Sequence, residues 1–405
     1  MSDSIWSDGG RIQMPQYEKL TRIKKVDVTI VGGGLCGLLC AYFLKEAGVE
    51  CLLLEGSRIG SGTVRHAMAQ VTSQHGLIYS RLLETLGEEK ARMYFEANEL
   101  ALHKYRELAA SIDCDFEERS SYIYSRTDKE CIEREVRAAS LLGMKAEFCE
   151  TPELPFDTAG AVRFPNQAQM NPVKFLYGLV KDIEKSDKVT IFEEMPVDDW
   201  INGTTWSGLY ITIPKNIICT THFPFYKKLY QNRSYIMALD HVPELHGMYA
   251  DASDNGLALR GYKDMIFVGG ATHRVGQEER DWNEFREKIL SYYPEAIERE
   301  HWEVEDCVSL DGIPYIGPYS DKTPNMYVAT GFNGWGMTSA MTAAMLLTDA
   351  IINGQKTNGA TESYPWGEVF YPERKIVRSQ YFANVKENVR ENIKSFLTRK
   401  SKIND

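Results

Sequence analysis

The N-terminal part of the chain alternates short apolar runs with glycine-rich turns. Residues 26–31 (VDVTIV) are mostly apolar and β-branched, which is typical of a strand buried on both faces. A helical stretch over 38–47 ends at Gly48, and residues 50–54 form a second apolar run that ends at Glu55. This order predicts a strand, a glycine turn, a helix and a second strand.

The turn between the first strand and the helix is GGGLCG. Gly32 permits a tight turn, Gly34 lets the backbone approach a pyrophosphate, and Gly37 lets the helix pack closely on the strand. The helix N-terminus offers unpaired N–H groups to phosphates, and Glu55 is placed to accept hydrogen bonds from a ribose. A plain glycine turn is the alternative, but the complete order of elements predicts a dinucleotide site.

The polar segments after Glu55 bear on which dinucleotide is bound. Residues 56–63 (GSRIGSGT) and 72–76 (TSQHG) are two further glycine and hydroxyl clusters. They favour a longer ligand, FAD, over a nicotinamide nucleotide, for which the chain would more often continue directly into its next strand–helix unit. Only one strand–glycine–helix unit occurs in the sequence, so we expect the flavin to be reduced by the substrate itself.

Apolar periodicity predicts a mixture of helices and strands in the rest of the chain. The helical patterns cover residues 80–110, 128–142 and 338–351, and the strand patterns cover 122–124, 163–164, 234–239, 257–260, 265–268 and 326–329. The loop 331–336 joins a strand to a helix, so N–H groups of a helix N-terminus should point out of it. A glycine-lined packing contact is the alternative there.

Composition and charge exclude several classes of protein. The 405 residues are 43% hydrophobic and 25% charged, which excludes global disorder. The net charge of −11 argues against a nucleic-acid partner. No apolar run approaches the ~20 residues of a membrane helix, and the N-terminus lacks a basic start and an apolar signal core. We therefore expect a cytoplasmic protein without an integral membrane segment.

Cysteines and histidines give little support for a metal site. The eight cysteines form no Cys-x-x-Cys pair, which suits free thiols in a reducing compartment. The eight histidines form neither His-x-His nor His-Glu-x-x-His, so we expect no metal site.

In these motifs the chain resembles the D-amino-acid oxidase, glycine oxidase and sarcosine oxidase superfamily of FAD-dependent oxidoreductases. Its landmarks are residues 28–55, 57–76, 217–222 (IICTTH), 305–317 (EDCVSLDGIPYIG, with Asp311, Gly312, Pro314 and Gly317) and 326–337 (MYVATGFNGWGM). The chain is most similar to a bacterial subgroup that often carries a C-terminal Rieske domain. No Cys or His follows Cys307, so Rieske ligands are absent there and another electron acceptor is expected.

The resemblance implies an α/β fold with a Rossmann-like FAD-binding domain and a discontinuous antiparallel-sheet (α+β) substrate domain. We expect the FAD-binding domain at 25–85, 150–228 and 305–355, the substrate domain at 86–149 and 229–304, and a C-terminal helical tail at 356–405. Residues 198–214 are shorter and less regular than the family's strand pair and are expected to be partly remodelled.

The resemblance and the glycine motif together predict a set of residues that bind FAD without a covalent bond. The loop 331–336 is expected at the pyrimidine edge of the flavin. The predicted set is Gly32, Gly34, Leu35, Cys36, Gly37, Glu55, Gly56, Ser57, Arg58, Gly62, Thr63, Thr72, Ser73, Gln74, His75, Thr220, Thr221, Asp311, Gly331, Phe332, Asn333, Gly334, Trp335, Gly336, Met337 and Thr338.

Oxidation of an amine by a flavin requires the protein to orient the substrate and hold its carboxylate. Arginine is suited to this because its planar fork binds two oxygens at once. The candidates are Arg233, Arg260 and Arg274, with Tyr235 as an added hydroxyl and His273 as a tuning group. A surface or core role is the alternative for each of them.

Two details of the resemblance concern the flavin itself. Sarcosine oxidases attach flavin through a cysteine upstream of the signature aspartate, but the spacing from Cys307 to Asp311 is shorter here. They also place a lysine over the flavin on the strand that here reads Met265 to Val268, which contains no basic residue. This absence favours a dehydrogenase over a fast oxidase.

The sequence thus predicts an FAD-dependent oxidoreductase that oxidises the C–N bond of a small amino acid or secondary amine to an imine. A same-fold enzyme that acts on a hydroxy acid and a flavin-binding protein without catalytic activity remain alternatives. The substrate's identity, the electron acceptor and the oligomeric state are open.

Overall fold

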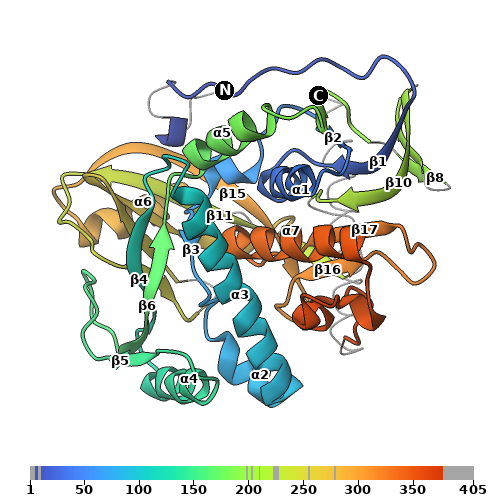
Figure 1. Ribbon diagram of the computed structural model, residues 1–405. Helices are drawn as coiled ribbons and strands as arrows, with labels where there is room; N and C mark the ends of the chain where they lie inside the picture. The colour runs from blue at the N-terminus through green and yellow to red at the C-terminus, as the bar shows by residue number, and fades with distance from the viewer. Residues whose placement is uncertain are drawn as a thin grey trace, which may run out of the picture.

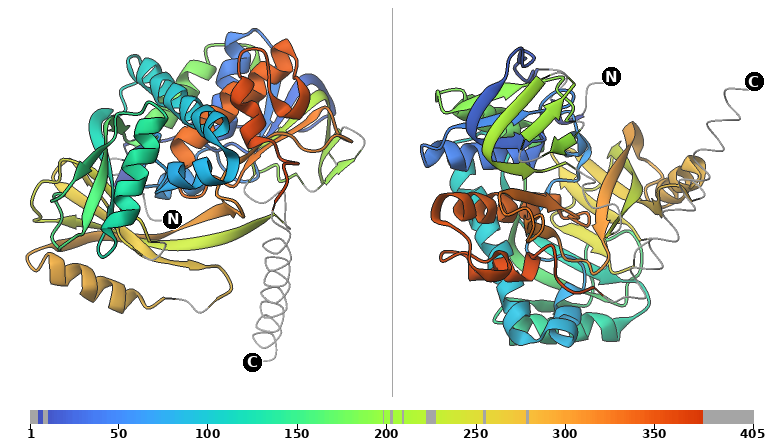
Figure 2. Two further views of the ribbon diagram at one scale, coloured as in Figure 1. Left: turned by 90° about the horizontal axis from the view of Figure 1, so that it is seen from below. Right: turned by 90° about the vertical axis from the view of Figure 1, so that its right-hand side faces the viewer.

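A computed structural model describes residues 5–7, 11–197, 199–201, 204–208, 210–221, 228–253, 256–277 and 280–376. Two sheets organise the chain (Figure 1). In the right-hand view of Figure 2, the blue and green strands of the first sheet lie at the upper left, and the yellow and orange strands of the second lie to the right.

The first sheet has the order β16-β17-β10-β1-β2-β7, and β9 and β8 extend it from β10. Its central five strands are parallel, whereas β16, β9 and β8 join in antiparallel pairs. The strands are β1 (Lys24–Val31), β2 (Cys51–Leu54), β7 (Val189–Phe192), β8 (Asp199–Ile201), β9 (Thr204–Ser207), β10 (Tyr210–Cys219), β16 (Tyr315–Pro318) and β17 (Met326–Thr330). The described residues of the segment 198–214, which was expected to be partly remodelled, form β8, β9 and the start of β10.

The second sheet has the order β15-β11-β14-β13-β12-β4-β6-β3, with β5 on β6. All its pairs are antiparallel except that of β12 with β4. The strands are β3 (Gln70–Val71), β4 (Glu117–Ser125), β5 (Glu147–Cys149), β6 (Gly160–Gln169), β11 (Leu229–Asp240), β12 (Met248–Asp251), β13 (Ala258–Tyr262), β14 (Met265–Arg274) and β15 (Ile297–Ser309). Strand β6 belongs to this sheet although it lies within 150–228, and β15 crosses the expected boundary at 305.

Helices cover both sheets. They are α1 (Leu35–Glu46), α2 (Ile78–Leu86), α3 (Glu88–Ala109), α4 (Lys129–Leu141), α5 (Pro172–Ile183), α6 (Trp282–Tyr292) and α7 (Gly336–Asn353), with the 3₁₀ helices η1 (Ile5–Ser7), η2 (Thr63–His66), η3 (Thr357–Gly359) and η4 (Pro365–Phe370). Helix α7 contacts α1 and the long helix α3, and its central part is buried throughout. None of the helices in the described ranges has both the length and the apolar character to span a membrane.

Local signals explain where several helices begin and end. Gly87 has a φ of +83°, so the expected helix over 80–110 is split there into α2 and α3. Asn171 caps α5 by accepting from the N–H groups of Val173 and Lys174, and Asp128 caps α4 in the same way through Cys131. The sequence patterns missed α5, α6, the long strand β15 and the shorter strands.

The segment after α7 differs from the expected helical tail in its described part. Residues 356–376 contain only η3 and η4, and η4 packs on α3 and β16. Residues 377–405 lie outside the described ranges.

Candidate functional site

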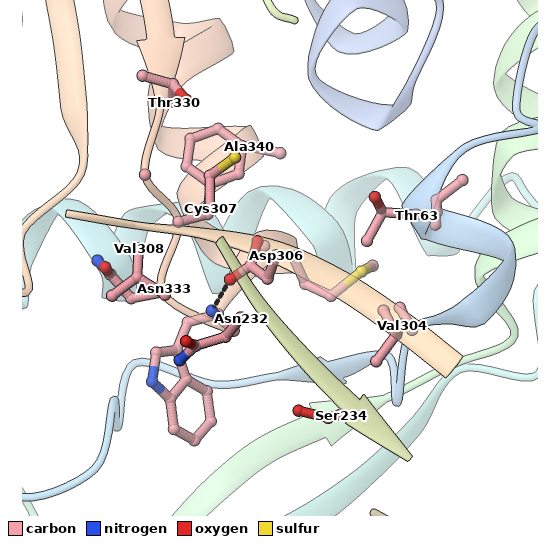
Figure 3. Close-up of a pocket in the computed structure, with 18 of the residues that line it drawn as sticks. Thr63, Asn232, Ser234, Val304, Asp306, Cys307, Val308, Thr330, Asn333 and Ala340 are labelled. Carbon is pink, nitrogen blue, oxygen red and sulfur yellow. Dashed lines mark hydrogen bonds between the residues drawn. The ribbon is translucent and has the colours of Figure 1, made fainter. Parts of the chain in front are cut away.

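A cavity of about 1670 Å³ runs from the carboxyl ends of β1 and β2 to the face of β14, β11 and β15. The glycine turn after β1 and the loop between β17 and α7 also line it. Figure 3 shows part of the wall where β11 and β15 meet this loop. The cavity therefore joins the predicted nucleotide site to the second sheet.

Close backbone packing shapes the glycine turn after β1. Gly32 has a φ of +109°, and a Cβ added to Gly37 would lie 1.9 Å from the Gly32 carbonyl oxygen. The Thr220 hydroxyl donates to the carbonyls of Val31 and Gly32 and so ties the turn to the end of β10. Gly32 and Thr220 line the cavity, but Gly37 does not, because it serves the contact between helix and strand.

Glu55 lies at the end of β2 and lines the cavity as expected. One carboxylate oxygen accepts from the Gly33 N–H at 2.7 Å, and the other accepts from the Ser57 N–H at 2.7 Å. These bonds hold the carboxylate between the two predicted loops, where its remaining lone pairs can accept from a ribose hydroxyl.

Gly56, Ser57, Gly62 and Thr63 also line the cavity, and Arg58 does not. The Arg58 guanidinium instead pairs with the buried carboxylate of Glu193 at 2.8 Å. In this structure the Arg58 side chain therefore links the loop to Glu193, and its contact with FAD stays a prediction.

The residues of segment 72–76 fall into two groups, those that line the cavity and those that are buried beside it. His75 and Gly76 line the cavity, whereas Thr72, Ser73 and Gln74 are buried beside it. The Ser73 N–H donates to Gln167 of β6 at 2.8 Å, so this part of the segment anchors the loop to the second sheet. Direct contact of these three side chains with a ligand in the cavity is not supported.

His75 is held in one tautomer under the glycine loop. Its Nε2–H donates to the Thr72 carbonyl at 2.9 Å, and its Nδ1 accepts from the Tyr94 hydroxyl at 2.6 Å. Burial lowers the pKa of His75 to about 3, so the ring is neutral near pH 7. The ring stacks on Trp335, with centroids 5.2 Å apart and planes at 18°. His75 thus supports the loop from beneath.

The loop between β17 and α7 is fixed to the end of β15. The Asn333 side-chain oxygen accepts from the Ser309 N–H at 2.8 Å, and the Gly334 N–H donates to the Asp306 carboxylate (Figure 3). Loop residues Gly331 to Met337 line the cavity, whereas Thr338 points to the Thr72 carbonyl. Among the described residues, no side chain caps the first turn of α1 or α7, so both helix ends can serve a ligand.

Asp311 has a different role from the one expected. Its carboxylate pairs with Arg374 through bonds of 2.7 and 2.8 Å, and it does not line the cavity, although its neighbours Leu310 and Gly312 do. Asp311 therefore holds the segment after η4 close to Leu310 and Gly312, which line the cavity. The sequence could not show this because Arg374 lies 63 residues away.

The five predicted substrate residues separate into two groups. Arg274 and His273 line the cavity, whereas Arg233, Tyr235 and Arg260 do not. The Arg274 guanidinium lies over the ring of Tyr230, 4.7 Å from its centroid. The His273 Nδ1–H donates to the Ala271 carbonyl at 2.9 Å.

The other three have structural partners. Arg233 pairs with Glu305 at 2.7 Å, and the Tyr235 hydroxyl donates to the Arg280 carbonyl at 2.7 Å. Arg260 is fully buried and donates to the carbonyls of Met68 and Ala69, and burial lowers its pKa to about 9. Of the three arginines predicted to hold a substrate carboxylate, only Arg274 lines the cavity.

Residues 265–268, where sarcosine oxidases carry a lysine over the flavin, do not line the cavity. Phe267 and Val268 lie in the core of the second sheet, and the cavity is lined by later residues of β14, namely Gly269, Gly270 and 272–274. Basic residues do lie on that part of the strand. The inference of a dehydrogenase from residues 265–268 therefore loses its basis.

Several cavity residues were missed because they carry no local motif. They are Asn232, Ser234, Thr272, Arg280, Asp306 and Arg81. Alternation along β11 would have placed Tyr230, Asn232, Ser234 and Ile236 on one face, but it could not say which face meets the cavity. Cys307 also lines the cavity, and burial raises the pKa of its thiol.

The cavity wall leaves room for FAD where backbone must approach a cofactor. A Cβ added to any of four lining glycines would meet no atom within 4 Å, so the backbone faces open space there: Gly34, Gly62, Gly76 and Gly334. Gly34 precedes α1 and Gly334 precedes α7, so both open positions adjoin helix N-termini, which favour phosphate and developing negative charge. The residues present fit FAD.

The chain is similar to several known proteins. Residues 27–350 match the family described as FAD dependent oxidoreductase (DAO). The chain is 31% identical over 386 residues to a putative Rieske 2Fe-2S iron-sulfur protein, YhfW, of Bacillus subtilis (strain 168), covering 89% of this chain and 74% of that protein. It is 24% identical to the probable oxidoreductase OrdL of Haemophilus influenzae, covering 83% and 85% respectively.

Solved structures show the same fold. Glycine oxidase from Geobacillus kaustophilus matches with a TM-score of 0.72 at 16% identity, covering 87% of this chain and 100% of that one. L-proline dehydrogenase from P. horikoshii matches with a TM-score of 0.70 at 14% identity, covering 86% and 97%. With the glycine cradle, the acid after β2 and the matched range, the chain belongs to the DAO family of FAD-dependent oxidoreductases.

Proposed function

We propose that this protein oxidises the C–N bond of a small amino acid or secondary amine to an imine, with FAD as the hydride acceptor. The observation that carries the proposal is the continuity of one cavity from the glycine turn at Gly34 to the Arg274 guanidinium on β14. A substrate held at the second sheet would therefore share one cavity with the cofactor.

Arg274 would hold the substrate carboxylate. Its guanidinium presents several N–H donors in one plane, and the Tyr230 ring beneath it, 4.7 Å away, restrains that plane. Holding a carboxylate in one orientation fixes the neighbouring Cα–H bond, and such positioning supplies much of the rate in reactions that need no protein nucleophile. A substrate that binds as an ammonium must lose one proton from nitrogen, to a cavity carboxylate or to solvent, before the hydride leaves Cα.

A bound flavin would accept the hydride that leaves the substrate Cα. The N-terminus of α7 and the N–H groups of the loop before it would stabilise the negative charge that develops on reduction. His75 would contribute by position only, because burial keeps it neutral and its two nitrogens are occupied.

The names of the structural relatives support an amino-acid substrate, since they include a glycine oxidase and an L-proline dehydrogenase. All eight cysteines are free thiols, which supports the proposal of a reducing, cytoplasmic location. The electron acceptor can be identified in the same experiment that tests the substrate.

The test is anaerobic reduction of the purified holoprotein. Amino acids, secondary amines and 2-hydroxy acids are added separately while the visible flavin absorbance is followed. We expect bleaching by amino acids or secondary amines and release of the corresponding oxo product after imine hydrolysis. Bleaching by hydroxy acids alone would reassign the substrate class, and no bleaching by any compound would indicate a non-catalytic flavoprotein. Adding oxygen or a quinone to the reduced protein then identifies the acceptor class.

A further inference from the structure

Three side chains form one row across the floor of the cavity. Asn232 of β11 is paired with Arg274 of β14 on one side and with Asp306 of β15 on the other, and all three line the cavity. Directly opposed residues of antiparallel strands project from the same face, with Cβ atoms about 5 Å apart. The row therefore places a cation, an amide and an anion across a span of about 10 Å.

The neighbouring rows of this floor are uncharged. Thr272, Ser234 and Val304 form the next row, in which the two hydroxyls share a hydrogen bond of 2.8 Å. Beyond it lie Ile236 and Gly269, which are apolar. Figure 3 shows Ser234 further along β11 than Asn232, with Asp306 beside Asn232. Of these three rows, only the row of Arg274, Asn232 and Asp306 carries charged side chains, and the two charges have opposite signs.

Both charged ends of the row are held in place. The Tyr230 ring lies under the Arg274 guanidinium, and the Gly334 N–H donates to the Asp306 carboxylate. A carboxylate offers about four acceptor sites, so the bond from the Gly334 N–H is compatible with a further contact to a ligand. Asp306 also joins the loop before α7, which places the negative end of the row on the side of that loop.

We propose that Asp306 binds the ammonium group of a substrate whose carboxylate is held by Arg274, with Asn232 between the two. The site then selects zwitterionic amino acids over simple carboxylates and simple amines. The proposal rests on the proposed function, because it assigns the polarity of that substrate. It also orients the substrate, with the nitrogen toward the loop before α7 and the carboxylate away from it.

A purely structural role for Asp306 makes a different prediction. In that case the carboxylate only fixes the loop through Gly334, and an uncharged acceptor serves equally well. Asp306→Asn retains a side-chain oxygen for the Gly334 N–H but removes the charge. Glu305→Gln is the matched control, because Glu305 is the adjacent residue of β15 and pairs with Arg233, which does not line the cavity.

The experiment measures binding without turnover. The holoprotein is reduced with dithionite under anaerobic conditions, and ligands are titrated by calorimetry. The probes are proline, tetrahydrofuran-2-carboxylate, which replaces the ring nitrogen by oxygen, and pyrrolidine, which lacks the carboxylate. Glycine, acetate and methylamine form a second set. The flavin spectrum of each variant confirms that the cofactor site is intact.

We expect the wild-type protein to bind at least one zwitterion more tightly than both of its partial analogues. Asp306→Asn should weaken the zwitterion about 10- to 100-fold and leave the carboxylate analogue unchanged, as expected for loss of a charge-assisted hydrogen bond. Arg274→Leu should weaken both, and Glu305→Gln neither. Equal effects of Asp306→Asn on the zwitterion and carboxylate, no effect on either, or no zwitterion binding to the wild-type protein would overturn the proposal.

This outcome is separable from that of the proposed function. If zwitterions bind with the expected dependence on Asp306 but no amino acid reduces the flavin, the binding assignment stands and the reaction is wrong. If amino acids reduce the flavin while Asp306→Asn leaves zwitterion binding unchanged, the reaction stands and the role of Asp306 is wrong.

Discussion

The two ends of the cavity are built by different means. At the nucleotide end, the wall comes from residues of two glycine-rich segments, the turn at 32–36 and the loop at 56–63, and open positions such as Gly34 adjoin a helix N-terminus. At the substrate end, the floor is a sheet face, and side chains from β14, β11 and β15 supply its chemistry. A cofactor with a fixed structure can be held by a common backbone cradle, whereas substrate choice needs side chains that can be exchanged.

This difference predicts which substitutions harm the fold and which harm recognition. In the turn after β1, Gly37 packs closely against backbone atoms, whereas Gly34 faces open space. On the second sheet, Arg274 of β14 lines the cavity, whereas Arg233 of the adjacent strand β11 pairs with Glu305 and does not line it.

The largest effect is expected from Gly37→Ala. The added Cβ would lie 1.9 Å from the Gly32 carbonyl oxygen, so the helix and the turn must separate. We expect a loss of about 3 kcal/mol in the free energy of unfolding and purification without bound flavin. Urea unfolding and the visible absorbance spectrum measure both.

Gly34→Ala is the contrasting variant, because its added Cβ meets no atom within 4 Å. Its unfolding free energy should stay within about 0.5 kcal/mol of wild type, while FAD affinity falls roughly tenfold through lost space. Equal destabilisation of the two variants would contradict the division between filled and open glycines.

On the substrate floor, Arg274→Leu should weaken binding of an amino-acid substrate about 100-fold, or about 2.8 kcal/mol. The reason is loss of the forked donor above Tyr230, and titration of the reduced holoprotein by calorimetry measures it. Arg233→Leu is the control, since Arg233 pairs with Glu305 away from the cavity. A comparable loss in both variants would show that affinity follows overall charge and not the row on the floor.

His75 lies against Trp335 of the loop before α7, and the effect expected from its substitution is smaller and depends on pH. Burial lowers its pKa from 6.5 to about 3. Between these values the unfolded chain binds a proton at His75 and the folded chain does not. Stability therefore falls as pH decreases through this window, by up to about 1.4 kcal/mol per pH unit.

His75→Gln retains a side-chain donor for the Thr72 carbonyl but cannot titrate. The difference in unfolding free energy between the variant and wild type should therefore shift in the variant's favour as pH is lowered from 6.5. Urea unfolding at several pH values measures the slope. Parallel curves for the two proteins would mean that folded His75 can be protonated and that its enclosure is incomplete.

Local motifs identified the nucleotide end well. The glycines at 32 and 34, Glu55, the loop at 331–336 and Thr220 all line the cavity, because a tight turn or a helix start imposes its residue types over a few positions. The failures there are side chains whose partners lie far along the chain. Asp311 pairs with Arg374, and Ser73 with Gln167, so a polar residue in the expected place serves the fold instead.

The substrate end was predicted poorly for a related reason. Arg233 and Arg274 are equivalent as residue types, and only the pairing of strands shows that Arg274 faces the cavity. Asp306 carries no signal of its own, since it is one acid among several in β15. Only the pairing of strands shows that Asn232 lies between Asp306 and Arg274, which places the two charged residues in one row.

The sequence by itself predicted a dinucleotide site and its position, because glycine, helix start and acid act within about thirty residues of chain. The polar segments after Glu55 and the family resemblance then favoured FAD. Tertiary structure alone decided which charged groups share the substrate floor. Strand register sets that arrangement, and a shift of one residue in β11 or β15 would turn the side chains of the shifted strand to the opposite face. No local pattern records such a register, since it depends on how three distant strands pack together.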